Sequence, residues 1–275
     1  MADEGYEVEA LLEVMARLRD PQTGCPWDRA QDFASLVPYL LEETYEVIDA
    51  IERADWRQLP EELGDLLLQV VFHAQIGSER GLFDFSGIVD RLVRKLITRH
   101  PHVFPDGTLA SRGAGEHEMA ELAASWRESK ARERRARGNP SVFDGVPAAA
   151  PALLRAQKLQ QRAAELGLDW NSAQGVFDKV CEELGELRAE VERGDARRAG
   201  EELGDLLFAV VNLARHLGVD AETALRRSAE KFARRARAVE EKLAARGERT
   251  APIDAGELDL LWRQAKESEG GGGGL

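Results

Sequence analysis

The stretch at residues 40–75, LLEETYEVIDAIERADWRQLPEELGDLLLQVVFHAQ, occurs a second time in the chain. It aligns without a gap with residues 180–215, VCEELGELRAEVERGDARRAGEELGDLLFAVVNLAR, at an offset of 140 residues, and about half of the paired positions are identical. Self-similarity of this kind indicates a duplicated structural unit. We therefore expect two related copies of one fold.

Each copy has the pattern of two consecutive helices. Apolar residues recur at spacings of three and four, as at Leu63, Leu66 and Leu67, which is the period of an amphipathic helix. Only three residues separate the two helices, and short loops make antiparallel neighbours. Further helices are expected on either side of each pair, at residues 6–19, 85–99, 153–166 and 221–245. The predicted fold is all-α, with two tandem four-helix units.

The domain boundaries follow from helix-breaking residues and from composition. Residues 100–115 are rich in proline and glycine, which interrupt helices. We expect a first domain at residues 1–115 and a second at residues 145–265. A charged helical connector is expected at residues 116–144, with its helix at 118–137, and a disordered glycine-rich tail at residues 266–275.

Charge and composition exclude several classes of function. A net charge of -13 argues against broad nucleic-acid binding, which needs a dense basic face. No apolar stretch reaches the roughly 18 residues that suggest a membrane span. The two cysteines, Cys25 and Cys181, lie far apart, and no signal segment opens the chain, so a cytoplasmic location is expected. An acidic protein can still bind a small anion through a bound cation or a few local basic residues.

Five acidic residues recur in register in the two copies, as E-E-x-x-E followed by E-x-x-D. Residues three apart share a helix face, so antiparallel helices would bring four of these carboxylates together. Converging carboxylates repel one another unless a cation lies among them, and hard oxygen ligands favour Mg²⁺, with Mn²⁺ as a second option. The predicted metal ligands are Glu43, Glu46, Glu62 and Asp65 in the first copy and Glu183, Glu186, Glu202 and Asp205 in the second.

The acidic pattern has two other interpretations. A single acidic run usually forms a solvated helix face, but recurrence of all five acids in register favours a metal site. Di-iron bundles also use carboxylate helices, yet they need a Glu-x-x-His motif that neither copy contains. Iron is therefore disfavoured.

Several motifs in order give the chain a specific resemblance. They are the E-E-x-x-E and E-L-G-D-L-L motifs, GCPWD at residues 24–28, RHPHVF at residues 99–104 and KFARR at residues 231–235. Together they resemble the MazG nucleoside triphosphate pyrophosphohydrolases over nearly the whole chain, including the tandem arrangement. The resemblance implies hydrolysis of a nucleoside triphosphate to a monophosphate and pyrophosphate, a requirement for Mg²⁺, and helical dimers.

The residues fit this chemistry independently of the resemblance. Carboxylate-bound Mg²⁺ can lower the pKa of a water that attacks the α-phosphorus, and Glu182 could orient or deprotonate that water. Lys231 and Arg235 are four residues apart on one helix face, where they could hold the departing pyrophosphate as catalytic and substrate-binding residues. The alternative for this basic pair is an ordinary basic surface helix.

The second half is expected to carry most of the activity. Lys179 lies one turn before the second carboxylate motif and could bind a phosphate, whereas its counterpart is Tyr39. Asn212 lies two turns after that motif and could hydrogen-bond the substrate, whereas its counterpart is Phe72. The first half keeps the basic pair, at Lys95 and Arg99.

Further hypotheses concern the oligomeric state of the protein, whether it is an enzyme, and the range of its substrates. Apolar positions such as Leu67, Val70 and Val71 need partners, which predicts a homodimer. A non-catalytic helical scaffold remains the competing hypothesis for the repeats. An enzyme restricted to deoxyuridine or deoxycytidine triphosphates is a third.

Overall fold

The computed structural model describes residues 5–113, 141–245 and 254–270, with residues 125, 126, 128, 129, 132 and 138 between them. These residues form ten helices and no strand, which confirms the predicted all-α class. The chain divides into two compact units, Met1–Ser129 and Lys130–Leu275. Most of the expected connector helix at 118–137 lies outside the described residues. None of the described helices is long and apolar enough to cross a membrane.

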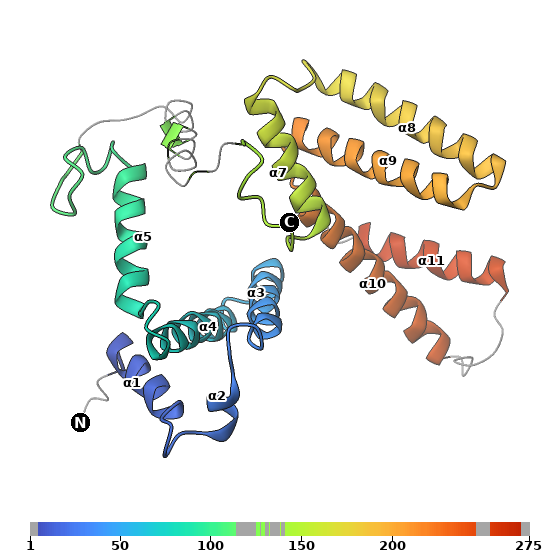
Figure 1. Cartoon of the computed structure of the whole chain (residues 1–275). Helices are drawn as coiled ribbons and strands as arrows, with labels where there is room; N and C mark the ends of the chain where they lie inside the picture. Colours follow the sequence, from blue (N-terminus) through green and yellow to red (C-terminus); the bar gives the residue numbers. More distant parts are fainter. Residues whose placement is uncertain are drawn as a thin grey trace. The chain divides into compact units, whose positions relative to one another are not determined.

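The first unit is built around one long helix. Helix α4 (Leu59–Glu79) contacts α1 (Val8–Leu18), α3 (Val37–Glu52) and α5 (Phe85–Arg99), and a short α2 (Pro26–Ala30) precedes α3 (Figure 1). The core is formed by side chains from α1, the start of α3 and the second half of α4. Its buried members are Met15, Leu36, Val71, Phe72 and Ile76.

The second unit is built around a helical hairpin. Helices α8 (Ala173–Arg193) and α9 (Ala196–His216) run side by side (Figure 1), and α7 (Ala152–Glu165) packs against α9. Helix α10 (Ala221–Ala245) contacts α7, α9 and α11 (Ala255–Gly270). A separate apolar cluster joins α10 to α11, with Val239, Leu243, Leu261 and Ala265 buried.

Proline explains why equivalent helices begin at different positions in the two units. Pro38 and Pro60 lie in the first turn of α3 and α4, and proline at the start of a helix restricts the residue before it. Helices α8 and α9 lack these prolines and begin about one turn earlier. Ser172 caps α8 by accepting a hydrogen bond from the backbone N–H of Gly175, and Asp195 caps α9 through the N–H of Arg198.

The sequence located most helices but not all. The flanking helices agree with the expected ranges to within two residues. The prediction that the tail begins at residue 266 is wrong, because α11 continues to Gly270, and α2 and α11 were not expected. The expectation that Val71 needs an external partner is also wrong, since Val71 is only 1% exposed in the core of the first unit.

Candidate metal centre

Three glutamates meet on the α8–α9 hairpin. One carboxylate oxygen from each of Glu183, Glu186 and Glu202 lies within 4.8 Å of the other two. Glu183 is buried, Glu202 is half-buried and Glu186 is exposed, so the group lies at the edge of the protein interior. The spacing of three within α8 and the pairing with α9 bring these side chains together, as the sequence pattern predicted.

The first unit contains the equivalent arrangement on α3 and α4. Oxygens of Glu43, Glu46 and Glu62 also lie within 4.8 Å of one another, and Glu62 is buried. The aspartates predicted to complete the two sets, Asp65 and Asp205, lie outside these groups of three. Each copy therefore brings together three of its four predicted ligands.

Crowding of like charges disturbs the carboxylates in both units. Burial raises the pKa of Glu202, and the charges of Glu186 and Asp205 raise it further. Burial and the charge of Asp65 likewise raise the pKa of Glu43 in the first unit. These shifts mean that ionised carboxylates repel one another here, which a bound cation would relieve. The oxygen-only donor set fits Mg²⁺ or Mn²⁺.

Lys179 already neutralises part of this charge in the second unit. Its ammonium lies 2.7 Å from a carboxylate oxygen of Glu182 and 2.7 Å from one of Glu183. The hydrogen bond to Glu182, followed in size by the one to Glu183, raises the pKa of Lys179 well above its usual value. Glu182 is exposed and paired with Lys179, while its neighbour Glu183 belongs to the carboxylate group.

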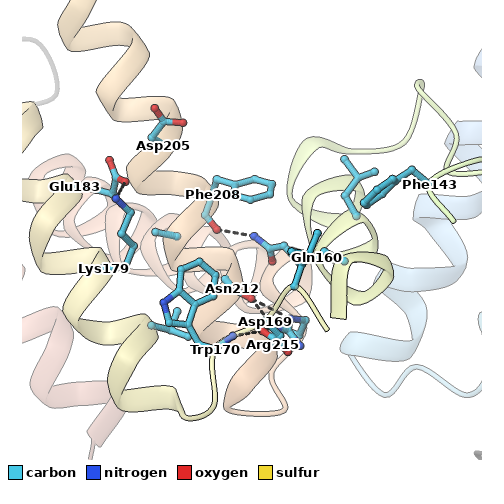
Figure 2. A pocket seen from close by; sticks show the side chains of 15 residues that line it. Phe143, Gln160, Asp169, Trp170, Lys179, Glu183, Asp205, Phe208, Asn212 and Arg215 are labelled. Carbon is cyan, nitrogen blue, oxygen red and sulfur yellow. Dashed lines mark hydrogen bonds and ion pairs between the residues drawn. The ribbon is translucent and has the colours of Figure 1, made fainter. Parts of the chain in front are cut away.

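A cavity of about 230 Å³ adjoins these carboxylates in the second unit. Glu183, Asp205 and Lys179 border it, and Figure 2 shows them clustered together, away from the side chains of Gln160 and Arg215. The walls come from α7, α8, α9 and the segments before α7 and α8. The other lining side chains that carry rings or polar groups are Phe143, Gln160, Asp169, Trp170, Phe208, Asn212 and Arg215.

A polar network fixes the segment that carries Trp170. The carboxylate of Asp169 accepts hydrogen bonds from Arg215 and from the ring of His216, the latter at 2.9 Å (Figure 2 shows the Arg215 contact). Arg215 also donates to the side-chain oxygen of Asn212, at 3.0 and 2.7 Å. Burial alone would raise the pKa of Asp169, but hydrogen bonds from Arg215, His216 and the Trp170 N–H lower it to about 2.

The structure places the predicted substrate-binding residues in two groups. Lys179 and Asn212 both line the cavity, although Asn212 is 3% exposed and its oxygen is occupied by Arg215. Lys231 and Arg235 lie on α10 and are not among the lining residues. The sequence did not single out Gln160 or Trp170. A shared Gly-x-x-Trp pattern, GCPW at residues 24–27 and GLDW at residues 167–170, could have indicated the tryptophan.

Aromatic side chains pack together at the equivalent positions of the first unit. Tyr39 and Phe72 replace Lys179 and Asn212, and the ring of Trp27 lies against both, with centroid distances of 5.7 and 6.5 Å. The guanidinium of Arg19 lies over the ring of Phe72, 5.3 Å from its centroid. The two positions that are polar in the second unit are therefore occupied by packed rings in the first.

A helical hairpin with convergent glutamates in each unit defines a tandem all-α protein with two carboxylate groups that could hold a metal ion. The MazG nucleotide pyrophosphohydrolase domain matches the chain twice, at residues 31–104 and 172–240. The nucleoside triphosphate pyrophosphohydrolase of Escherichia coli strain K12 is 48% identical over 265 residues, which cover 96% of this chain and 98% of that protein.

A second relative extends this similarity. The nucleoside triphosphate pyrophosphohydrolase/pyrophosphatase MazG of Thermotoga maritima is 42% identical over 266 residues, which cover 97% of this chain and 98% of that protein. The chain belongs to the MazG family and is a nucleotide pyrophosphohydrolase. Both alignments cover nearly the whole chain and therefore span both of its units.

Proposed function

We propose that the second unit hydrolyses nucleoside triphosphates to nucleoside monophosphates and pyrophosphate with Mg²⁺ held by Glu183, Glu186, Glu202 and Asp205. The substrate class follows the printed names of the relatives. The observation that carries the assignment to the second unit is the cavity beside its carboxylates. Bound Mg²⁺ would neutralise phosphate oxygens and supply an activated water.

Chain residues around the carboxylates have distinct roles in this proposal. Glu182 is exposed next to the carboxylate group and can accept a proton from the attacking water once Lys179 turns to a phosphate. Lys179 is already the cation nearest to Glu183, so it is positioned to contact a phosphate that approaches the carboxylates. Lys231 and Arg235, one turn apart on α10, would hold the departing pyrophosphate.

The first unit is proposed to bind a divalent cation without contributing much turnover. Glu43, Glu46, Glu62 and Asp65 provide the same donor types as the second unit. Tyr39 and Phe72 pack against Trp27 at the positions where the second unit has a lysine and an asparagine. Lys95 and Arg99 keep a basic pair on α5, so this unit would serve in assembly or regulation.

Matched substitutions in the full chain test the assignment. Glu202→Gln and Glu62→Gln remove the same carboxylate from the second and the first unit, because the two positions are 140 residues apart. We expect Glu202→Gln to reduce Mg²⁺-dependent pyrophosphate release by at least about 100-fold, since it removes a metal ligand, and Glu62→Gln to leave it within about 2-fold. Equal losses of pyrophosphate release in the two variants would refute the assignment of the activity to the second unit alone.

Substrate range and cellular role form the remaining part of the proposal. Assaying a panel of ribo- and deoxyribonucleoside triphosphates separates a general enzyme from one restricted to deoxyuridine or deoxycytidine triphosphates. A general enzyme fits a role in controlling the cytoplasmic nucleotide pool. The scaffold hypothesis is not retained, because the chain belongs to an enzyme family.

A further inference from the structure

We propose that Gln160 is a specificity-determining residue whose side-chain carbonyl accepts a hydrogen bond from an N–H group of the substrate's base. This inference rests on the proposed function, since it places the base of a nucleoside triphosphate in the cavity beside the carboxylates. Four observations support it: the orientation of the amide, its missing partner, a neighbouring glutamine that differs, and the shape of the cavity.

A backbone contact fixes the orientation of the Gln160 amide. Its nitrogen donates to the backbone carbonyl of Phe208, at 2.8 Å (Figure 2). A carbonyl oxygen can only accept, so the nitrogen rather than the oxygen of Gln160 must face it. The side-chain oxygen is consequently held on the other side of the amide, where it can only accept a hydrogen bond.

The oxygen of Gln160 has no donor within the protein. Gln160 is 5% exposed, and its Oε1 is a buried atom without a hydrogen-bond partner. Leaving a buried acceptor unpaired is unfavourable, and a donor on a bound ligand would recover that loss. No group of the described residues lies within hydrogen-bond distance to supply one.

Gln157, one turn earlier on α7, shows what a structural glutamine looks like in this unit. Gln157 is also buried, but both ends of its amide are used. Its nitrogen donates to the carbonyl of Val219, and its oxygen accepts from the backbone N–H of Ala221. Gln157 therefore joins α7 to the start of α10, whereas Gln160 satisfies only half of its amide and borders the cavity.

The cavity suits a base better than a whole nucleotide. Its volume of about 230 Å³ is below the roughly 300–1,000 Å³ of pockets for drug-sized ligands. Trp170 and Phe208 provide ring surfaces against which a flat base can pack. Lys179 and the carboxylates border the same cavity, so a base among the rings would leave its phosphates near the proposed metal ligands.

The test uses two nucleotides that differ by one donor. Adenine has a single N–H donor group off its ring, the amine at C6, and purine riboside triphosphate lacks it. Non-hydrolysable triphosphate analogues of both would be bound to the full chain in Mg²⁺ and measured by calorimetry. We expect the adenine analogue to bind roughly 10-fold more tightly, because only it can pair with the Gln160 oxygen.

Two variants of similar shape separate recognition from packing. Gln160→Met removes the acceptor and should bring the two affinities to within about 2-fold. Gln157→Met should keep the roughly 10-fold preference, because its amide is used within the protein. Equal binding of the two analogues by the unaltered chain, a preference that survives Gln160→Met, or no binding of either analogue would overturn the inference.

The inference and the proposed function fail separately in this design. Pyrophosphate release from the hydrolysable nucleotide reports on the proposed function alone, whereas the ratio of the two affinities reports on Gln160. The ratio in the unaltered chain requires no substitution, so equal affinities would overturn the inference even when Gln160→Met does not fold.

Discussion

At the scale of single residues, Ala54 and Gly194 occupy the same position in the two copies. Both lie in the turn between the carboxylate helices, and both have positive φ, 55° for Ala54 and 76° for Gly194. The left-handed conformation costs a residue with a Cβ atom roughly 1–2 kcal/mol, whereas glycine adopts it freely. The first copy therefore has a less favourable residue in this turn.

Replacing Ala54 with glycine should stabilise the first unit. Relief of the left-handed alanine exceeds the extra chain entropy of glycine, so Ala54→Gly should raise the free energy of unfolding by roughly 0.5–1 kcal/mol. The reverse change, Gly194→Ala, should lower it by about 1 kcal/mol. Denaturant unfolding of the full chain measures both, and destabilisation by Ala54→Gly would contradict the expected cost.

The effect of neutralising Glu202 on the melting temperature should depend on whether metal is bound. Glu202 is repelled by its acidic neighbours, so Glu202→Gln should raise the melting temperature of the metal-free protein. Mg²⁺ at about 100 times its Kd should raise the melting temperature of the unaltered chain by several degrees, and this rise should be smaller in Glu202→Gln. Scanning calorimetry with and without a chelator makes the comparison. Identical Mg²⁺ responses in the two proteins would exclude Glu202 as a ligand.

At the scale of elements, the segment before α8 depends on the end of α9. Asp169 joins the two through Arg215 and His216, and its pKa of about 2 lies below the ordinary value of 3.8. A lowered carboxyl pKa stabilises the fold above pH 4, and this contribution is lost as the pH falls toward 2. Trp170 follows Asp169 directly, so the network also positions a wall of the cavity.

Removing the Asp169 charge should loosen this wall. Asp169→Asn leaves Arg215 without its ionised partner and should lower the free energy of unfolding by about 1–3 kcal/mol at pH 7. The difference from the unaltered chain should shrink below pH 4, because the unaltered carboxyl also becomes protonated. Denaturant unfolding at several pH values tests this, and a difference that stays constant down to pH 2 would argue against the network.

The sequence predicted the elements that repeat and missed the ones that do not. Convergence of Glu183, Glu186 and Glu202 followed from helical spacing and a short turn, since both are local properties. The cavity did not follow, because Gln160 lies on α7 and Trp170 on an irregular segment, and only tertiary packing brings them to α9. Helix α11 was missed because its apolar side faces one neighbour, α10, and a glycine run follows it.

At the scale of the whole molecule, the carboxylate hairpins expose apolar side chains. Leu203, Leu207 and Val210 of α9 are 46%, 49% and 43% exposed. Leu67 and Val70 of α4, the counterparts of Leu207 and Val210, are 38% and 37% exposed. A run of exposed apolar residues along one helix is typical of a surface covered by another protein chain. Self-association about a two-fold axis is the commonest arrangement.

We expect the full chain to be a dimer at micromolar concentration, and light scattering measures this directly. Leu207→Lys introduces a charge into the apolar run and should shift the chain toward monomer. Leu166→Lys is the control, because Leu166 is 54% exposed but follows the end of α7 and is not part of the apolar run on α9. A monodisperse monomer of the unaltered chain, or equal effects of the two variants, would contradict the dimer.

The three rings of the first unit bear on how a duplicated enzyme unit diverges. Trp27 touches both Tyr39 and Phe72, so changing any one ring leaves the other two in place. A return to the arrangement of the sister unit needs both Tyr39→Lys and Phe72→Asn, because these two positions differ between the copies. After a duplication, packed rings at these positions make the loss of polar residues in one copy easier than their recovery.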